Sequence, residues 1–186
     1  LSDTDKRRIA VALGQAEYVE IPATAAMEAG NEFERWLAVN SYTVETGWEN
    51  NFYLTSEIIK PNNFKIFAHA DFYDDVNKIV VEAKYTSSSL EQTENDCIAQ
   101  LQWYYMLGVE QVYLVKGYPG SDFDKFNERF IIRDENFIDI LLRGIKIIDE
   151  FCDTFIYTEK DEWTEGDLLP HEQRAAQLMY NYLEQI

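Results

Sequence analysis

Two segments near the middle of the sequence carry side chains whose types and spacing suit catalysis. The first contains Asp71, and the second, which begins eleven residues later, is the triplet Glu82-Ala83-Lys84. Side chains at positions i and i+2 of a β-strand share one face of the sheet, so Glu82 and Lys84 would point the same way. If the two segments pair as an antiparallel hairpin, the carboxylate of Asp71 comes close to that of Glu82.

Such a cluster is suited to a hard divalent cation. Two carboxylates and one backbone carbonyl, here that of Ala83, are ligands that Mg²⁺ or Mn²⁺ accepts, and the other coordination positions remain for water and phosphate oxygens. The metal would acidify a water molecule and neutralise charge on the phosphate. Lys84 would hold or help to deprotonate the attacking water and stabilise the transition state. The pattern predicts metal-dependent hydrolysis of a phosphodiester bond.

The triplet alone leaves a second interpretation open. A Glu-x-Lys sequence should occur by chance about once in a chain of this length and composition, and it can be an ordinary ion pair on an exposed strand. The segment is otherwise apolar, however, with Ile79-Val80-Val81 leading into the triplet. Charged residues in an apolar strand are costly unless they are paired or bind a metal, which favours a functional site.

Two further segments add polar groups that could reach the same site. Glu34 lies beside an apolar stripe at helical spacing, Phe33, Trp36 and Leu37, and is a candidate third acidic ligand. In a later helix Gln100 and Tyr104 stand at i and i+4 on one face, where an amide and a phenol could contact phosphate or a frayed base. Packing of that helix's aromatic residues into the core is the alternative.

The order of secondary structure elements predicts how these residues are positioned. Apolar periodicity, turn residues and helix caps predict helices and strands as follows: helix Ala25–Asn40, strands Asn51–Ile59, Phe64–Tyr73 and Lys78–Thr86, helix Glu94–Leu107 ended by Gly108, strands Gln111–Tyr118 and Glu128–Arg133, a long helix capped by Asp134, and a last helix from about His171. This order indicates an α/β (α+β) fold in which helices flank a central mixed β-sheet.

At this point the chain resembles the PD-(D/E)XK nuclease superfamily, in its phage lambda exonuclease-like and RecB-like branch. The resemblance runs from about residue 30 to 117. Gly30–Glu34 looks like the motif whose final glutamate joins the metal site, Asp71 matches the motif-II aspartate, and Glu82–Lys84 matches the E-x-K motif. The segment Gln100–Tyr104 looks like the Q-x-x-x-Y helix, and Gln102 suits the Q-x-Q variant seen in phage-type exonucleases.

The resemblance implies a restriction-endonuclease-like core and Mg²⁺-dependent (or Mn²⁺-dependent) hydrolysis of linear duplex or single-stranded DNA, often exonucleolytic and coupled to recombination. Asp71, Glu82, the Ala83 carbonyl and Glu34 would bind the metal, and Gln100, Gln102 and Tyr104 would contact the substrate. A recombination partner protein and a homo-oligomer would also fit. His69 departs from the glycine common two residues before the aspartate, and we expect it to be structural. The iron-sulfur cysteines of some RecB-like members are absent, which favours the phage exonuclease side.

Composition sets bounds on this interpretation. The 186 residues suit one nuclease domain, 1–186, with its core motifs at about 30–117 and a C-terminal helical part at about 134–186. Cys97 and Cys152 form no metal-binding spacing, so we expect buried reduced thiols. No apolar run approaches the roughly 20 residues of a membrane span, and no secretory signal pattern opens the sequence, so we expect a cytoplasmic protein.

The net charge of −18 is the main observation against a nuclease, because phosphate backbones are bound by lysine and arginine. It favours a non-catalytic acidic binding protein, for example a DNA mimic. A mimic needs exposed acids, however, and has no need of Glu-x-Lys in an apolar strand. A third alternative keeps the nuclease fold without activity, as an assembly module, and the intact Asp71, Glu82 and Lys84 argue against it.

Overall fold

The structure, a computed structural model, describes residues 3–19, 22–42 and 48–156. The helix predicted from about His171 lies outside these residues. The described elements are, in chain order: α1 Asp3–Ala12, α2 Ala25–Leu37, a π-helical turn η1 Ala38–Tyr42, β1 Glu49–Thr55, β2 Phe67–Asp74, β3 Ile79–Tyr85, α3 Leu90–Met106, β4 Gln111–Gly117, β5 Asn127–Ile131 and α4 Glu135–Cys152. The chain divides into two compact units, and residues 23–56 and 67–138 form the unit that contains all five strands, α2 and α3.

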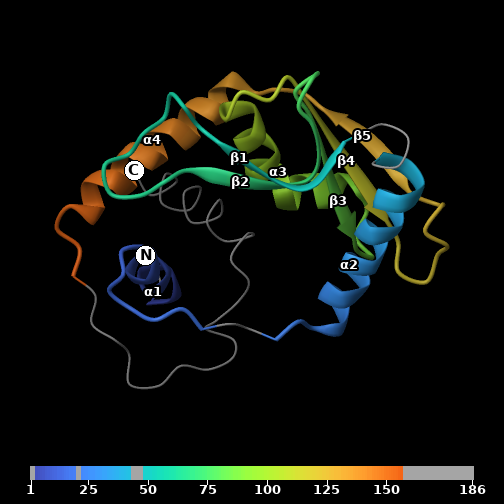
Figure 1. The fold of residues 1–186 in the computed structure, drawn as a ribbon, viewed down its shortest axis with the longest axis horizontal. Helices are drawn as coiled ribbons and strands as arrows, with labels where there is room; N and C mark the ends of the chain where they lie inside the picture. Colours follow the sequence, from blue (N-terminus) through green and yellow to red (C-terminus); the bar gives the residue numbers. More distant parts are fainter. Residues whose placement is uncertain (1–2, 20–21, 43–47, 157–186) are drawn as a thin grey trace. The chain divides into compact units, whose positions relative to one another are not determined.

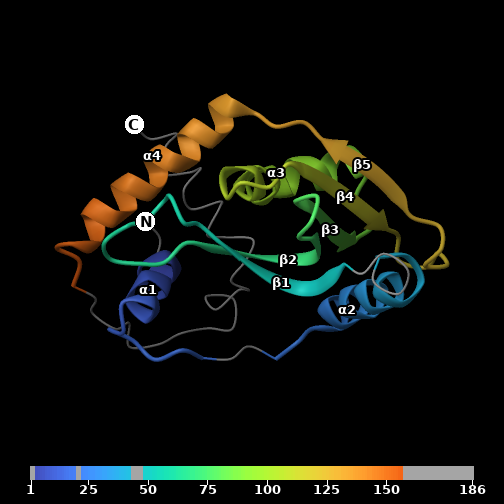
Figure 2. The ribbon, with the colours of Figure 1, turned by 45° about the horizontal axis from the view of Figure 1, so that its top comes forward.

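The five strands form one sheet in the order β1-β2-β3-β4-β5. Three of the four strand pairs are antiparallel, and β3 pairs with β4 in parallel. A parallel pair needs a crossover connection, and α3 supplies it. Helices α2 and α3 lie on opposite faces of the sheet (Figures 1 and 2). The predicted mixed sheet flanked by helices is therefore confirmed.

Turn and cap residues explain where the site elements begin and end. Asp74 Oδ1 accepts hydrogen bonds from the backbone N–H groups of Val76 (3.0 Å) and Asn77 (3.1 Å), which closes the predicted hairpin between β2 and β3. Ser89 accepts from the Gln92 N–H (3.1 Å), so α3 begins at Leu90, four residues before the predicted start. The left-handed backbone of Gly108 (φ +97°) follows the end of α3, as predicted.

The first two predicted strands extended too far into the segment that joins them. Strand β1 ends at Thr55 and β2 begins only at Phe67. Within the other compact unit, the backbone N–H groups of Asn62 and Asn63 donate to the carboxylate of Asp149 in α4, both at 2.8 Å. These two residues lie in the segment between the two predicted strands, and the carboxylate satisfies their backbone donors there.

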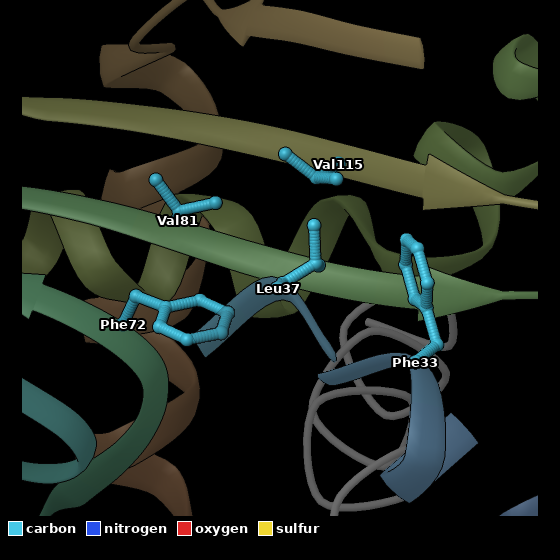
Figure 3. Close-up of a cluster of buried hydrophobic side chains, with 5 residues drawn as sticks. All are labelled: Phe33, Leu37, Phe72, Val81 and Val115. Atoms are coloured by element: carbon cyan, nitrogen blue, oxygen red, sulfur yellow. The ribbon is translucent and has the colours of Figure 1, made fainter. Parts of the chain in front are cut away.

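The sheet face under α2 is a close-packed apolar layer. Its buried members come from α2 and from three neighbouring strands: Phe33, Leu37, Phe72, Val81 and Val115 (Figure 3). Since side chains alternate along a strand, residues next to these, such as Asp71 and Glu82, face the side covered by α3. The alternation thus places the polar site residues on the α3 face.

Gly117 at the end of β4 gives a direct test of this packing. A Cβ atom built on Gly117 would lie 2.8 Å from ring atoms of both Phe33 and Tyr85. We expect Gly117→Ala to lower the free energy of unfolding by about 1–3 kcal/mol, the usual cost of overpacking a core. Chemical denaturation checks the value, with Gly30→Ala in α2 as control because no atom lies within 4 Å of its added Cβ. Equal stability of wild type and Gly117→Ala would contradict the close approach of α2 to the sheet.

Candidate active site

The carboxylate of Asp71 stands where the pairing of β2 and β3 ends. The ladder joins Asp74 to Ile79, Tyr73 to Val80 and Phe72 to Val81, and goes no further. At the next position the Asp71 Oδ2 atom accepts a hydrogen bond from the backbone N–H of Ala83 at 2.7 Å. The side chain of Asp71 therefore replaces a backbone acceptor and is fixed against β3, as the predicted hairpin required.

The second carboxylate, Glu82, is held from three directions. It is only 2% exposed. Its Oε1 atom accepts from the Lys84 ammonium and from Gln100 Nε2 (2.8 Å), while Oε2 accepts from the Tyr104 hydroxyl (2.5 Å). A buried carboxylate with donors on both oxygens is fixed in position.

The Tyr104 hydroxyl ties together three parts of the site. Besides Glu82, it lies 2.9 Å from the His69 carbonyl oxygen, and it accepts a hydrogen bond from Gln100 Nε2 at 3.2 Å. A hydroxyl has one proton, and the shorter contact to a charged acceptor favours donation to Glu82. Burial, and then the negative charges of Glu82 and Asp71, raise the pKa of Tyr104 well above its ordinary value, so the donor keeps its proton.

The site holds more negative than positive charge. Burial, followed by repulsion from Glu82, raises the pKa of Asp71 well above its ordinary value, and Glu34 raises it further while Lys84 opposes the shift. Burial lowers the pKa of Lys84, but the charges of Glu82 and Asp71 outweigh it and raise the pKa overall, so Lys84 is an ammonium ion. Lys84 thus faces the carboxylates of Asp71 and Glu82, and the charge of Glu34 in α2 also acts on Asp71.

These donors fit a hard divalent cation by their chemistry. The N–H and C=O groups of one strand residue point to the same side, so the Ala83 carbonyl is directed to the side where its N–H meets Asp71. Two carboxylates and this carbonyl form an all-oxygen set, and a cation would offset their repulsion. Among the described residues, no group of three or more His, Cys, Asp or Glu side chains is arranged to hold a metal ion. A metal site at Asp71 and Glu82 therefore needs the Ala83 carbonyl as its third protein ligand.

The structure separates two residues that the sequence placed together. Gln100 is at the site, but Gln102 is buried elsewhere, where its Nε2 donates to the Ile132 carbonyl (2.8 Å) and its Oε1 accepts from the Asp134 N–H (2.9 Å). Helical positions two residues apart differ by about 200° around the axis, so both cannot face one site. The predicted substrate contact of Gln102 is therefore corrected to a structural role that joins α3 to the start of α4.

The two hydrogen bonds of the Gln102 side chain predict that Gln102→Ala is less stable than wild type. The change removes two partly buried hydrogen bonds, to the Ile132 carbonyl and from the Asp134 N–H, and at about 0.5–1.5 kcal/mol each we expect their loss to lower the free energy of unfolding by about 1–3 kcal/mol. Gln92→Ala, on the exposed surface of the same helix, should change it by less than about 0.5 kcal/mol. Thermal or chemical denaturation of both variants measures the difference. Equal stability of the two would show that the Gln102 bonds do not form.

One neighbouring residue was not identified from the sequence. Lys116 on β4, the register partner of Lys84, is completely buried; its Nζ donates to the Thr86 carbonyl (2.8 Å) and lies 3.0 Å from the centroid of the Tyr118 ring. Burial lowers its pKa. The signal that could have found it is the one that singled out Glu82, namely a charged residue in an apolar strand. The hydrogen bond from Lys116 to the Thr86 carbonyl holds the segment that connects β3 to α3.

The cysteines and His69 behave as the sequence predicted. Cys97 and Cys152 are buried and free. Burial, opposed by the nearby Lys84 charge, raises the pKa of Cys97 to about 12, and its thiol donates to the Thr93 carbonyl at 3.0 Å. The His69 ring stacks on Tyr53 with centroids 4.6 Å apart. None of the three occupies a nucleophile's position in the site.

The fold is shared with the solved structure of an exonuclease, and two further exonuclease structures match less well. A phage-related exonuclease from Haemophilus somnus 129PT superposes with a TM-score of 0.53, at 17% identity, over 81% of this chain and 80% of that chain. An alkaline exonuclease (LHK-Exo) from Laribacter hongkongensis gives a TM-score of 0.47 at 19% identity, over 80% and 82% of the two chains. The same enzyme in complex with dAMP gives 0.41 at 17% identity, over 78% and 89%. No protein-family model and no curated protein sequence matches the chain.

Proposed function

We propose that this chain is a Mg²⁺- or Mn²⁺-dependent deoxyribonuclease that hydrolyses phosphodiester bonds, and that it acts as an exonuclease on linear DNA. The observation that carries the proposal is the buried Glu82 carboxylate, held by Lys84, Gln100 and Tyr104 beside Asp71. Burying such charges in an apolar strand is costly unless they are paired or bind a metal. Buried ionisable groups of this kind are concentrated at functional sites. The resemblance of the sequence motifs and the fold shared with the Haemophilus somnus exonuclease support the same reaction.

The metal would be held by Asp71, Glu82 and the Ala83 carbonyl, while Glu34, whose charge acts on Asp71, stays a predicted further ligand. When bound, it supplies Lewis-acid activation of water and neutralises phosphate charge. Gln100 and Tyr104 orient Glu82, so we assign them positioning roles. Tyr104 is fully buried and would not touch the substrate itself. Of the three residues predicted to bind substrate, only Gln100 would combine its positioning role with a substrate contact, because it is partly buried.

Lys84 would act on the reacting groups. Its side chain remains 23% exposed, whereas that of Glu82 is 2% exposed. Because the neighbouring carboxylates raise its pKa, Lys84 orients the attacking water and stabilises the negative charge of the transition state instead of removing a proton. From the sequence we expected Lys84 to hold the water or to help deprotonate it, and its raised pKa favours the first role.

The acidic DNA mimic is a second candidate, supported by the net charge of −18. A mimic presents its acids to solvent, whereas Glu82 is buried and is bound by three donors. A recombination partner protein and a homo-oligomer remain predictions. DNA cleavage separates the mimic from the nuclease.

The test compares linear with covalently closed duplex DNA, in Mg²⁺ and in chelator. We expect loss of the linear duplex and release of mononucleotides in Mg²⁺, with the closed circle intact and no reaction in chelator. Nicking or linearisation of the circle would assign an endonuclease. An absence of cleavage in Mg²⁺ and in Mn²⁺, for a protein shown to be folded, would contradict the nuclease proposal.

A further inference from the structure

A row of rings lies on the same sheet face as Asp71. Phe67, His69 and Asp71 alternate along β2 and so share a face, and Tyr53 of β1 is the register partner of His69. The Tyr53 ring stacks on His69 (4.6 Å between centroids, 23° between planes) and lies 5.9 Å from the ring of Phe67. At about 3.3 Å per residue, the row reaches roughly 13 Å from Asp71. It therefore leads away from the candidate active site along the strand.

The outer rings of this row are not part of the core. Tyr53 is 62% exposed and Phe67 is 56% exposed. The indole Nε1 of Trp103 donates to the Phe67 carbonyl at 3.2 Å, so α3 fixes the backbone that carries the second ring. Neighbouring exposed aromatic rings on a fixed backbone form a preorganised binding surface for a flat apolar group.

The charge of the chain decides which ligand fits this surface. With 16 lysine and arginine residues against 34 aspartate and glutamate residues, attraction between basic side chains and phosphate is a weak source of affinity for this chain. Stacking of a base on an aromatic ring needs no charge and typically changes the affinity roughly tenfold per base. Bases in a duplex are already stacked on their neighbours, so only unpaired bases are available to these rings.

We propose that Tyr53 and Phe67 bind unpaired bases of the strand whose phosphate is cleaved at Asp71 and Glu82, so that the substrate is single-stranded at the site. The inference rests on the proposed nuclease function and adds the form of the substrate to it. A few nucleotides of one strand span the distance from the carboxylates to Phe67. The rings hold that strand while the acidic surface elsewhere repels its backbone.

Binding is measured separately from cleavage, in the Lys84→Ala background with Mg²⁺, by the fluorescence anisotropy of a labelled twelve-residue oligothymidine. We expect Tyr53→Thr and Phe67→Thr each to weaken binding about tenfold, and Tyr53→Phe to change it less than twofold. Threonine keeps strand propensity, and both sites are exposed, so thermal melts should change little. Phe130→Thr is the matched control, because this ring is 50% exposed but contacts Tyr113, which packs on the α2 face, and it should bind like wild type.

An abasic oligonucleotide of equal length and charge completes the test. It should bind more weakly than oligothymidine, and its affinity should not respond to Tyr53→Thr or Phe67→Thr. Equal affinities for the two oligonucleotides, or no effect of either substitution, would overturn the inference. An oligomer that dissociates on Tyr53→Thr with unchanged oligothymidine affinity would also overturn it and assign the face to a second copy of the chain.

The outcomes separate this inference from the nuclease proposal. If the wild-type chain cleaves DNA but binding does not depend on the rings, the single-stranded inference fails alone. If oligothymidine binding depends on the rings but the wild-type chain does not cleave, the base-binding surface stands and the nuclease proposal fails.

Discussion

Replacement of Lys84 by alanine is expected to slow DNA cleavage by about 10²-fold or more, because the change removes the ammonium that we propose stabilises the charge of the reacting phosphate. The ammonium contacts Glu82, and the pKa of Lys84 is raised by Glu82 and Asp71, so its charge is present over the whole working pH range. The measurement is single-turnover cleavage of end-labelled linear DNA at equal concentrations of folded protein.

Two further variants control for charge and geometry. Lys125→Ala removes an exposed lysine that pairs with Asp122, and should cleave like wild type. Lys84→Arg keeps the charge but replaces a compact ammonium with a planar guanidinium, so we expect activity well below that of wild type. Cleavage by Lys84→Ala at close to the wild-type rate would refute the assignment of this lysine.

Asp71→Asn is expected to abolish cleavage and to remove most of the stabilisation by divalent ions. An ion that binds only the folded state stabilises by RT ln(1 + [L]/Kd), so about 10 mM Mg²⁺ against a Kd on the order of 1 mM adds roughly 1.4 kcal/mol, a shift of a few degrees in Tm. The asparagine Oδ1 can still accept from the Ala83 N–H, so the fold should be kept. Differential scanning calorimetry with and without Mg²⁺ checks this, with Na⁺ at matched ionic strength as control.

The same variant should reveal the raised pKa of Asp71 in metal-free protein. A carboxyl whose pKa is higher in the folded than in the unfolded state binds more protons when folded, so its contribution to stability is present at low pH and is lost as pH rises through the folded-state pKa. The metal-free Tm of Asp71→Asn, relative to wild type, should therefore increase from about pH 4 upwards. Equal Mg²⁺ stabilisation of both proteins would mean that ions merely screen an acidic surface, and would favour the DNA mimic.

Much of the site was predictable because it depends on local periodicity. The alternation of side chains in β3 puts Glu82 and Lys84 on one face, and the Tyr73–Asn77 turn brings Asp71 beside them, so sequence spacing alone located the cluster. Gln100 and Tyr104 followed in the same way from helical spacing. The mixed sheet followed from the order of strands and helices.

The features that sequence reasoning missed depend on contacts between distant segments. Gln102 was assigned by motif resemblance, but its partners come from the connection between β5 and α4. The backbone partner of Asn63 is Asp149, which is 86 residues away. No local pattern contains these contacts.

Nucleotide release from linear DNA, measured as Mg²⁺ is titrated, tests whether Asp71, Glu82 and Lys84 form a metal-dependent cleavage site. Wild type, Asp71→Asn and Lys84→Ala are purified in parallel, so that a contaminating nuclease would appear equally in all three. We predict Mg²⁺-dependent nucleotide release by wild type that is abolished by chelator. In both variants we predict release that is lower by about 10²-fold or more. Equal release by all three proteins, or no release by folded wild type in Mg²⁺ or Mn²⁺, would contradict these predictions.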